Sequence, residues 1–278
     1  MLARSFQVAS SLKNSGTGFG GHVFSLLNQT LRAQGKKKLQ QPRALQANYS
    51  LDYVTCEDDL EKISLGLLNN PHARICCYGP PGTGKTAWAN WLGEQLGMPV
   101  LLKQGSDLLG VYVGETEKNI VDAFEQATEQ NMLLVLDEVD SFLFARDGAE
   151  RSWERSMVNE MLTQIERFDG LLVVSTNLMH QLDYAALRRF DLKIRFSYLK
   201  EKQLLLLARQ QAGQLGLPNL SDEQEERLKQ MHQLAPGDFS AIARRHRFAV
   251  FDDVDAWIDA LVKECELKPQ ESRKMGFM

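Results

Sequence analysis

The chain has 278 residues, of which 44% are hydrophobic and 24% are charged, and its formal net charge is −4. These proportions are ordinary for a globular protein, so they exclude a disordered chain, a collagen and a coiled-coil rod. At about 150 residues per domain, the length predicts roughly two domains or one large one. No stretch approaches the roughly 18 consecutive apolar residues of a membrane-spanning helix, so we expect neither an integral membrane protein nor a membrane partner.

The four cysteines are Cys56, Cys76, Cys77 and Cys265, and none of them forms a C-x-x-C motif. This spacing argues against a zinc ribbon and against a disulfide scaffold. Cys76 and Cys77 stand in an apolar run, where we expect two small buried side chains. A reducing compartment is the simplest setting, and we expect a cytoplasmic protein.

Residues 1–51 contain seven basic residues and no acidic residue, so the rest of the chain is net acidic. Residues 1–50 are rich in Gly and Ser, then in Lys and Gln, and we expect an N-terminal extension. Three interpretations remain open: a solvated arm, which we favour, a patch for nucleic acid or another acidic partner, or an organelle transit peptide. The last interpretation would place the protein in an organelle matrix.

Apolar periodicity predicts alternating helices and strands after residue 51. We expect strands at residues 74–78, 99–103, 132–136, 171–175 and 193–197. We expect helices at residues 58–69, 87–96, 116–130 and 153–168. This alternation is typical of an α/β fold in which helices cover both faces of a parallel sheet.

Beyond Tyr198 the strands stop, and four helices are predicted at residues 201–215, 221–233, 236–251 and 254–266. Ser221 and Gln224 fit a capping box at the start of the second of these helices. We therefore predict three parts: the extension over residues 1–50, an α/β domain over 51–199 and a small all-helical domain over 200–278.

A phosphate-binding motif, G-x-x-x-x-G-K-[ST], directly follows the first predicted strand. Its residues are Gly79, Pro80, Pro81, Gly82, Thr83, Gly84, Lys85 and Thr86, and Ala87 begins the helix that follows. The backbone amides of such a loop and the helix N-terminus attract phosphate. We expect Lys85 to contact the β- and γ-phosphates and Thr86 to bind Mg²⁺. The α/β domain is thus predicted to have a P-loop NTPase fold.

A pair of carboxylates, Asp137 and Glu138, ends the apolar strand predicted at residues 132–136. Ligands of such sheets bind at the carboxyl ends of the strands. We expect Asp137 to hold Mg²⁺ and Glu138 to orient and deprotonate the attacking water. A general base at this position predicts hydrolysis as well as binding.

From about Asp52 to its end the chain resembles the AAA+ ATPases, and in particular the katanin- and spastin-like members of the AAA family proper. Four further stretches carry the resemblance: residues 171–177 resemble the sensor-1 strand, 182–191 the arginine-finger segment, 108–117 the first pore loop and 235–239 the sensor-2 turn. The resemblance implies bound ATP and Mg²⁺, a homo-oligomeric ring, expected to be a hexamer, and a lid role for the helical domain. It also implies that Asn177 helps to place the attacking water, and that Gly237 approaches the nucleotide.

The resemblance assigns the arginine fingers to Arg188 and Arg189, which would reach the nucleotide of a neighbouring subunit. We expect both at the start of an edge-strand segment and unpaired within their own subunit. The family often has Pro-Gly between its two arginines, whereas here they are adjacent, which leaves open which one contacts the γ-phosphate. We favour Arg189, with Arg188 next.

Within the stretch that resembles the first pore loop, Tyr112 and Val113 are predicted to hold an extended polypeptide in the central pore of the ring. Residues 147–151 fit a second pore loop no better than a solvated turn. Arg244, Arg245 and Arg247 are expected on one helix, where a solvated basic face is favoured over a phosphate contact. The chain has no H-E-x-x-H motif, so the protease fused to some family members is not expected.

The favoured function is therefore an ATP-driven remodeller that pulls polypeptide into a ring, with a separate adaptor as one possible source of targeting. Two alternatives remain open. A nucleic-acid-directed ATPase is suggested by the basic N-terminal segment, and an ATP-dependent regulatory switch would bind ATP without moving a substrate.

Overall fold

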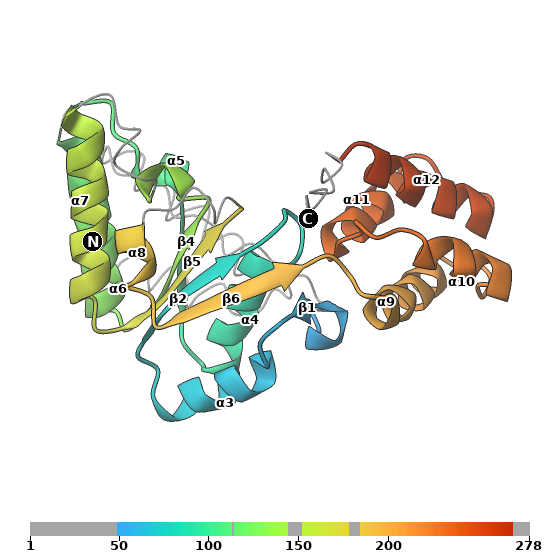
Figure 1. Cartoon of the computed structure of the whole chain (residues 1–278), viewed down its shortest axis with the longest axis horizontal. Coiled ribbons are helices and arrows are strands. Elements are labelled where there is room, and N and C mark those ends of the chain that lie inside the picture. The colour runs from blue at the N-terminus through green and yellow to red at the C-terminus, as the bar shows by residue number, and fades with distance from the viewer. Residues whose placement is uncertain (1–48, 113, 144–151, 178–183, 269–278) are drawn as a thin grey trace, which may run out of the picture. The chain divides into compact units, whose positions relative to one another are not determined.

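The computed structural model describes residues 49–112, 114–143, 152–177 and 184–268, all within one compact unit of the chain. Figure 1 shows a twisted sheet with helices on both faces, followed by four helices coloured orange to red. No helix of the described ranges is both long enough and apolar enough to cross a membrane.

Six strands form the sheet in the order β1-β6-β2-β5-β4-β3. Their bounds are β1 (Thr55–Cys56), β2 (Ala73–Tyr78), β3 (Val100–Gln104), β4 (Leu133–Asp137), β5 (Leu171–Thr176) and β6 (Leu192–Ser197). The pairs from β6 to β3 are parallel, as predicted. β1, which was not predicted, adds one antiparallel pairing with β6 at the edge of this mostly parallel sheet.

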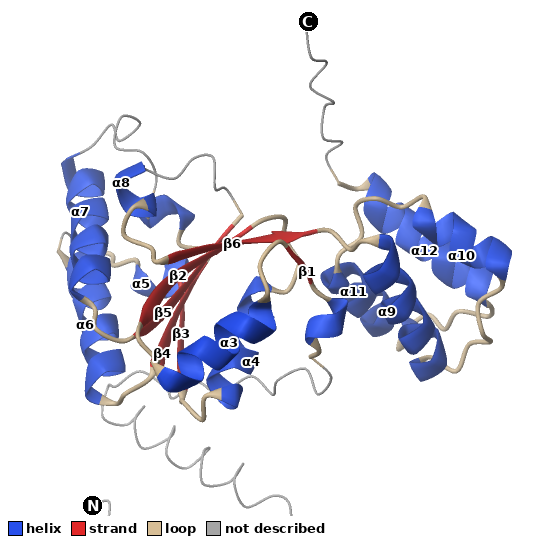
Figure 2. Ribbon diagram, turned by 60° about the horizontal axis from the view of Figure 1, so that its bottom comes forward, coloured by secondary structure: helices blue, strands red, loops and turns tan. Residues whose placement is uncertain are grey.

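Helices lie on both faces of the sheet (Figure 2). The central strands β2, β4 and β5 are buried, and their alternate residues belong to two different apolar clusters. Ile75, Val135 and Val173 belong to a cluster with α3 (Leu60–Asn69) and α4 (Lys85–Gln95). Cys76, Leu134 and Leu172 belong to a cluster with α6 (Glu115–Glu129) and α7 (Ser152–Arg167). This two-sided burial explains why these strands are continuous apolar runs rather than alternating ones.

The expected helices and strands of the α/β domain are all present, with ends shifted by one or two residues. Four short helical segments were not predicted, because they are shorter than the period that reveals a helix: η1 (Leu51–Tyr53), α5 (Gly105–Leu108), η2 (Asp140–Phe142) and α8 (Tyr184–Leu187). Cys76 and Cys77 are fully buried, as expected.

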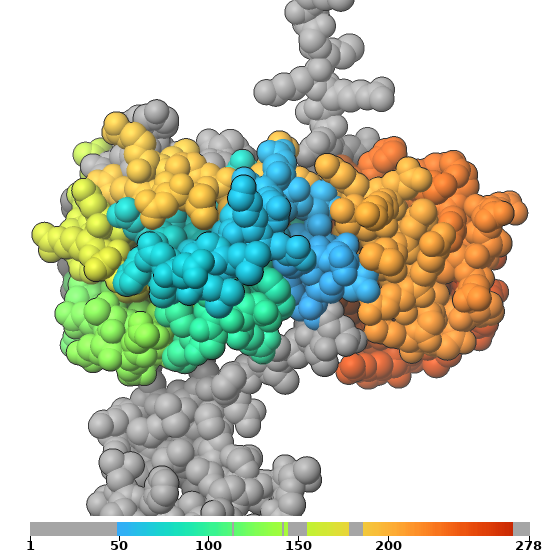
Figure 3. Space-filling view, turned by 90° about the horizontal axis from the view of Figure 1, so that it is seen from below, coloured from blue at the N-terminus to red at the C-terminus, as the bar shows by residue number. Residues whose placement is uncertain are grey.

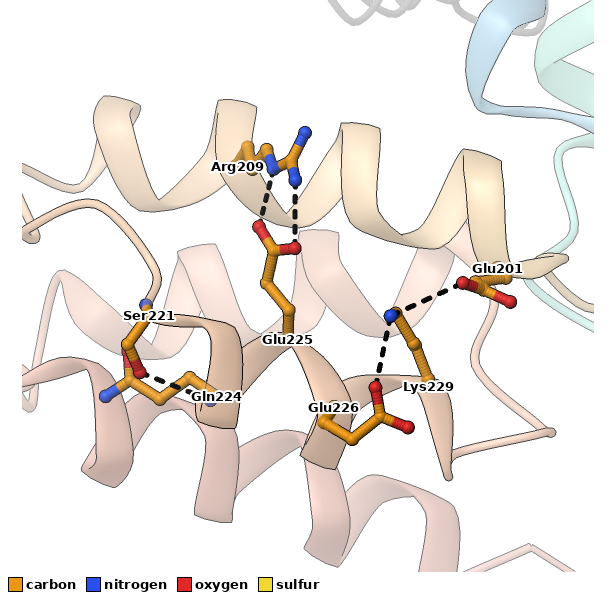
Figure 4. Close-up of polar contacts among 7 residues, drawn as sticks. All are labelled: Glu201, Arg209, Ser221, Gln224, Glu225, Glu226 and Lys229. Carbon is orange, nitrogen blue, oxygen red and sulfur yellow. Dashed lines mark hydrogen bonds and ion pairs between the residues drawn. The ribbon is translucent and has the colours of Figure 1, made fainter.

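The four C-terminal helices are α9 (Glu201–Gln214), α10 (Asp222–Lys229), α11 (Pro236–His246) and α12 (Val254–Glu266). They share a separate apolar cluster around Trp257 and Phe239. The predicted capping box of Ser221 and Gln224 is present. Figure 4 shows this box and the two-point ion pair of Arg209 on α9 with Glu225 on α10.

The start of the described chain contacts the first of these helices. The backbone N–H of Lys200 donates to Thr55 Oγ1 at 3.2 Å, and η1 packs against α9. In Figure 3 the blue segment that includes η1 accordingly lies beside the orange helix. Residues 51–56 thus contact both the sheet and the first helix of the helical domain.

Candidate nucleotide site

The phosphate-binding motif forms a loop between the carboxyl end of β2 and the start of α4, as predicted. Gly79, Gly82 and Gly84 all have positive φ. A Cβ atom at Gly79 would lie 2.0 Å from the carbonyl oxygen of Phe196, so only glycine fits there. Thr83 is buried and donates from Oγ1 to the carbonyl oxygen of Pro80 at 2.8 Å. The loop is therefore held by its own contacts and by the neighbouring strand β6.

The Lys85 ammonium lies inside this loop. Its Nζ donates to the carbonyl oxygens of Gly79 (2.9 Å) and Pro80 (2.8 Å) and to Asn177 Oδ1 (2.8 Å). Burial lowers the pKa of Lys85 from its ordinary 10.5 to about 8, and the charge of Asp137 opposes this shift. A buried cation held by neutral oxygens is well suited to receive an anionic ligand.

The lowered pKa of Lys85 predicts a pH dependence of phosphate binding. The ammonium form prevails below about pH 8, so the affinity for ATP should fall as the pH rises through that value, by up to about tenfold per pH unit. Titration with a fluorescent ATP analogue over about two pH units on either side of this value would measure the slope. Lys85→Arg keeps the charge and should flatten the slope; an equal slope in that variant would show that another group titrates.

Asp137 lies at the end of β4, directly beside the helix that follows the loop. Its Oδ1 accepts a hydrogen bond from Thr86 Oγ1 at 2.9 Å and another from Ser175 Oγ. One carboxylate and one hydroxyl are what a Mg²⁺ ion needs from a protein when phosphates and water supply its remaining ligands. The residues present therefore fit Mg-ATP. In the described ranges no cluster of three or more His, Cys, Asp or Glu offers a different metal site.

Glu138, the expected base, follows Asp137 with its side chain exposed to solvent. Its φ of 53° is in the left-handed region, which is rare for a residue other than glycine and is typical of functional positions. A Cβ atom on Gly105 would lie 2.6 Å from the carbonyl oxygen of Glu138, so α5 closely supports this backbone. The carboxylate is exposed, and its charge acts on Lys85 of the phosphate loop.

Asn177 follows β5, the strand next to β4, and its contact with Lys85 brings it to the phosphate loop. The role of Asn177 as the sensor-1 residue stays a prediction. The neighbouring Thr176 donates from Oγ1 to Asp140, which lies in η2 just beyond Glu138. Hydrogen bonds therefore connect the ends of β4 and β5 around the site.

Gly237, near the start of α11, contacts the phosphate loop directly. Its backbone N–H donates to the carbonyl oxygen of Gly82 at 2.9 Å, and a Cβ atom here would lie 2.8 Å from Gly82 Cα. The helical domain thus reaches the predicted nucleotide site at this residue, as expected. The exposed Arg244 and Arg247 lie toward the other end of α11, about 10 Å or more along the helix axis, so they are not beside the loop.

Arg188 and Arg189 follow the short helix α8 and precede β6. Arg189 donates from Nε and Nη2 to Glu166 Oε2, at 3.2 and 3.1 Å. The expectation that both arginines are unpaired in their own subunit is therefore wrong for Arg189. β1 pairs only with Phe196 and Ser197 at the end of β6, so the start of β6, next to the two arginines, has a partner strand on one side, β2. Arg188 is exposed.

Residues 75–198 match the family model described as "ATPase family associated with various cellular activities (AAA)". This span includes the phosphate loop, both strand-end carboxylates, Asn177 and both arginines. The chain contains an AAA ATPase domain.

Similar proteins agree with this AAA assignment. An uncharacterized AAA family ATPase of Sinorhizobium fredii is 40% identical over 122 residues, which cover 43% of this chain and 37% of that protein. Spastin of Xenopus tropicalis is 31% identical over 223 residues, which cover 75% of this chain and 34% of spastin. The 26S proteasome regulatory subunit 7 homolog of Saccharomyces cerevisiae is 34% identical over 170 residues, which cover 52% of this chain and 36% of that protein. The chain thus spans about a third of the length of these relatives.

The predicted pore segment of this AAA ATPase is a surface loop before α6. Tyr112 is 78% exposed, so its side chain is not part of the core. The backbone N–H groups of Val111 and Tyr112 donate to Glu115 Oε2, at 2.8 and 3.2 Å, so the loop is tied to the first turn of the helix. Val113, the second predicted pore residue, and residues 147–151, the second pore-loop candidate, lie outside the described residues.

Three residues of this AAA site were given no role from the sequence. Ser175 and Thr176 stand in the strand run that resembles sensor 1, and their hydroxyl groups contact Asp137 and Asp140. A polar pair at the end of an otherwise apolar strand could have indicated them. Glu166 had no such signal, because it is one of several charged residues on the exposed side of α7.

Proposed function

We propose that this AAA ATPase hydrolyses Mg-ATP within a homo-oligomeric ring, taken to be a hexamer, and uses the cycle to remodel polypeptides. The observation that carries the proposal is the convergence of Lys85, Thr86, Asp137 and Asn177 on one phosphate loop. Lys85 and Thr86 stand at the start of α4, and Asp137 and Asn177 stand at the ends of β4 and β5. Together they would provide the cation, the metal ligands and the polar group that phosphoryl transfer requires.

The residues of the chain would act in the following order. The loop from Gly79 to Thr86 would bind the phosphates, with the ammonium of Lys85 exchanging its contacts with loop carbonyls for phosphate oxygens. Thr86 and Asp137 would hold Mg²⁺, which supplies Lewis acidity when bound. The amide of Asn177 would orient the attacking water, and the carboxylate of Glu138 would accept its proton.

The arginines would complete the site of a neighbouring subunit. Cationic guanidinium groups stabilise the negative charge that spreads over the transferring phosphoryl group. Arg189 is held by Glu166 within its own chain, so it would have to exchange this ion pair for a phosphate contact on assembly. Arg188, at the adjacent position, is exposed and is the other candidate for this contact. Hydrolysis should therefore depend on ring formation.

A polypeptide substrate is supported by the exposed aromatic loop and by similarity to a proteasome regulatory subunit. Tyr112 and Val111 are 78% and 90% exposed and stand together before the start of α6. An exposed aromatic and an exposed aliphatic side chain on such a loop can pack against the side chains of an extended polypeptide without a strong preference for its sequence. Choice of substrate would then come from an adaptor or from a segment outside the ATPase core.

Substitution of Tyr112 tests the substrate class. Tyr112→Ala should abolish binding of a fluorescently labelled, permanently unfolded polypeptide while affinity for ATP stays within about twofold, because the loop lies away from the phosphates. Fluorescence anisotropy in the presence of Mg-ATP measures the first quantity, and titration with an ATP analogue measures the second.

Tyr112→Phe is the matched control, since it keeps the ring and should keep polypeptide binding. Full polypeptide binding by Tyr112→Ala would remove the pore-loop assignment. Tight binding of single-stranded nucleic acid in place of polypeptide would favour the nucleic-acid-directed alternative.

A further inference from the structure

The passage from the α/β domain to the helical domain is held by contacts that the nucleotide site does not explain. Residues 198–200 connect β6 to α9, and the backbone N–H of Leu199 donates to the carbonyl oxygen of Leu234 at 2.8 Å. Leu234 is fully buried and lies just before the first turn of α11. The connecting residues therefore lie against the turn that brings Gly237 to the phosphate loop.

A lysine just beyond the carboxyl end of α12, Lys268, joins this turn to the connecting residues. Its Nζ donates to Asp238 Oδ2 and to the carbonyl oxygen of Gln233, the latter at 2.6 Å. The same ammonium lies 5.0 Å from the centroid of the Tyr198 ring, which is within the range of a cation–π interaction. One cation thus contacts the segment after β6, the segment before α11 and the first turn of α11.

Asp238, the partner of this lysine, also shapes the start of α11. Its Oδ2 accepts from the backbone N–H of Ala235 at 2.7 Å, and its own backbone N–H donates to the carbonyl oxygen of Ala235 at 3.0 Å. The preceding residue, Gly237, donates from its backbone N–H to the carbonyl oxygen of Gly82 at 2.9 Å. A displacement of Asp238 would therefore move Gly237 relative to the phosphate loop.

The ion pair of Lys268 with Asp238 differs from a surface ion pair. Its side chains are 16% and 13% exposed, whereas those of Arg227 and Asp255, which join α10 to α12, are 41% and 58% exposed. Exposed pairs contribute little because water screens them. Removing one partner of a largely buried pair leaves the other charge uncompensated, so the structure around it has to rearrange.

Both charges also stand at the helix ends that favour them. Asp238 lies in the first turn of α11, where a negative charge is favourable, and Lys268 lies just past the last turn of α12, where a positive charge is favourable. The backbone N–H of Lys268 donates to the carbonyl oxygen of Cys265 at 3.1 Å. The lysine therefore reaches Asp238 from a defined turn.

We propose that Lys268 is a positioning residue for the nucleotide. Through Asp238 it fixes the first turn of α11, and with it the contact of Gly237 with the phosphate loop. Its ammonium contacts Asp238, Gln233 and Tyr198, which all lie outside the phosphate loop, so it acts through other residues. This role rests on the part of the proposed function in which the phosphate loop binds Mg-ATP.

Lys268→Met tests this role, because methionine keeps an unbranched apolar side chain but removes the charge. The Kd for Mg-ATP, measured with a fluorescent analogue, should rise about tenfold, while turnover at saturating ATP should stay within about twofold. Lys268→Arg keeps the cation and should retain most of the affinity. Lys263→Met, which removes an exposed lysine from α12, is the matched control and should change neither quantity.

A double-variant cycle tests the ion pair itself. Asp238→Asn keeps an acceptor for the backbone N–H of Ala235 but removes the charge, so it should weaken ATP binding by itself. In Lys268→Met/Asp238→Asn the two losses of affinity should not add, because each substitution breaks the same contact. Fully additive losses would show that the two residues act separately, and the proposal would be wrong.

Hydrogen exchange without nucleotide distinguishes positioning from a general effect on folding. Lys268→Met should speed exchange of the amides at residues 234–240 by about tenfold, whereas amides within α10 should exchange at the rate of the unmodified chain. Faster exchange throughout the four C-terminal helices would mean that Lys268 only stabilises the helical domain, and would overturn the positioning role.

Two further outcomes separate this proposal from the proposed function. If the unmodified chain binds and hydrolyses Mg-ATP but Lys268→Met binds it equally well, the positioning role is wrong and the proposed function stands. If the unmodified chain stays monomeric and binds no polypeptide, but Lys268→Met still weakens binding of Mg-ATP, the proposed ring is wrong and the positioning role stands.

Discussion

Replacing Glu138 by Gln should lower the turnover of ATP by about 10²–10⁴-fold while the chain still binds Mg-ATP. The amide has nearly the same size as the carboxylate but cannot accept a proton from water. Lys85, Thr86 and Asp137 keep their contacts around the phosphate loop, because none of these contacts involves the Glu138 side chain. Phosphate release measures turnover, and titration with a fluorescent analogue measures binding.

A matched control for this variant is Glu129→Gln, which neutralises an exposed carboxylate at the end of α6. It should leave both quantities unchanged. Turnover within tenfold of the unmodified chain would remove Glu138 as the base. Loss of Mg-ATP binding would instead assign it to the metal.

The same variant can identify the substrate. A ring that binds ATP without hydrolysing it should remain in the form that binds polypeptide. The Glu138→Gln variant purified with ATP from its native host should therefore retain its polypeptide substrate. Loss of that polypeptide in the Tyr112→Ala double variant would show that it is held by the pore segment. Nuclease-sensitive material would favour the nucleic-acid-directed alternative.

Removing either arginine before β6 should lower turnover by a factor of up to about 10³–10⁵, the range expected for a finger that stabilises the transition state. Arg188→Ala and Arg189→Ala should both keep ATP affinity, because neither residue belongs to the phosphate loop of its own chain. The larger loss identifies the residue that contacts the γ-phosphate. Mixing each variant with the unmodified chain tests whether the arginine acts on a neighbouring subunit. In that case the loss of ATPase activity should exceed the fraction of variant subunits in the mixture.

Glu166→Gln is the matched control for Arg189. It removes the ion pair with Arg189 but leaves the guanidinium, and an exposed pair of this kind contributes only about 0–1 kcal/mol to the free energy of unfolding. If Arg189 acts in the neighbouring site, Glu166→Gln should retain most of the turnover that Arg189→Ala loses. Equal losses in the two variants, or a strictly proportional decline in mixtures, would mean that Arg189 has only a structural role.

Much of the α/β domain could be predicted because its signals are local. The strand runs at residues 132–136 and 171–175 are buried on both faces, and their apolar composition follows directly from that burial. The predicted bounds of α12 agree with the structure, where Asp253 caps its first turn. Strand β1 was missed because two residues cannot show a period, and its pairing with β6 depends on a partner about 140 residues away.

The predicted nucleotide site follows from similar reasoning. Parallel strands end at one edge of a sheet, so the motifs after β2, β4 and β5 were expected together, and the contacts of Lys85 with Asn177 and of Thr86 with Asp137 agree. The roles of these residues in catalysis stay predictions until the variants above are measured.

The sequence by itself determined the family, the order of elements and the residues of the phosphate loop, because each depends on spacing within a short segment. Only the tertiary structure decided that Glu166 holds Arg189 and that Gly237 touches Gly82. These contacts join side chains on separate helices and strands. The geometry of these contacts depends on how the helices and strands pack against one another. A local sequence pattern cannot predict it.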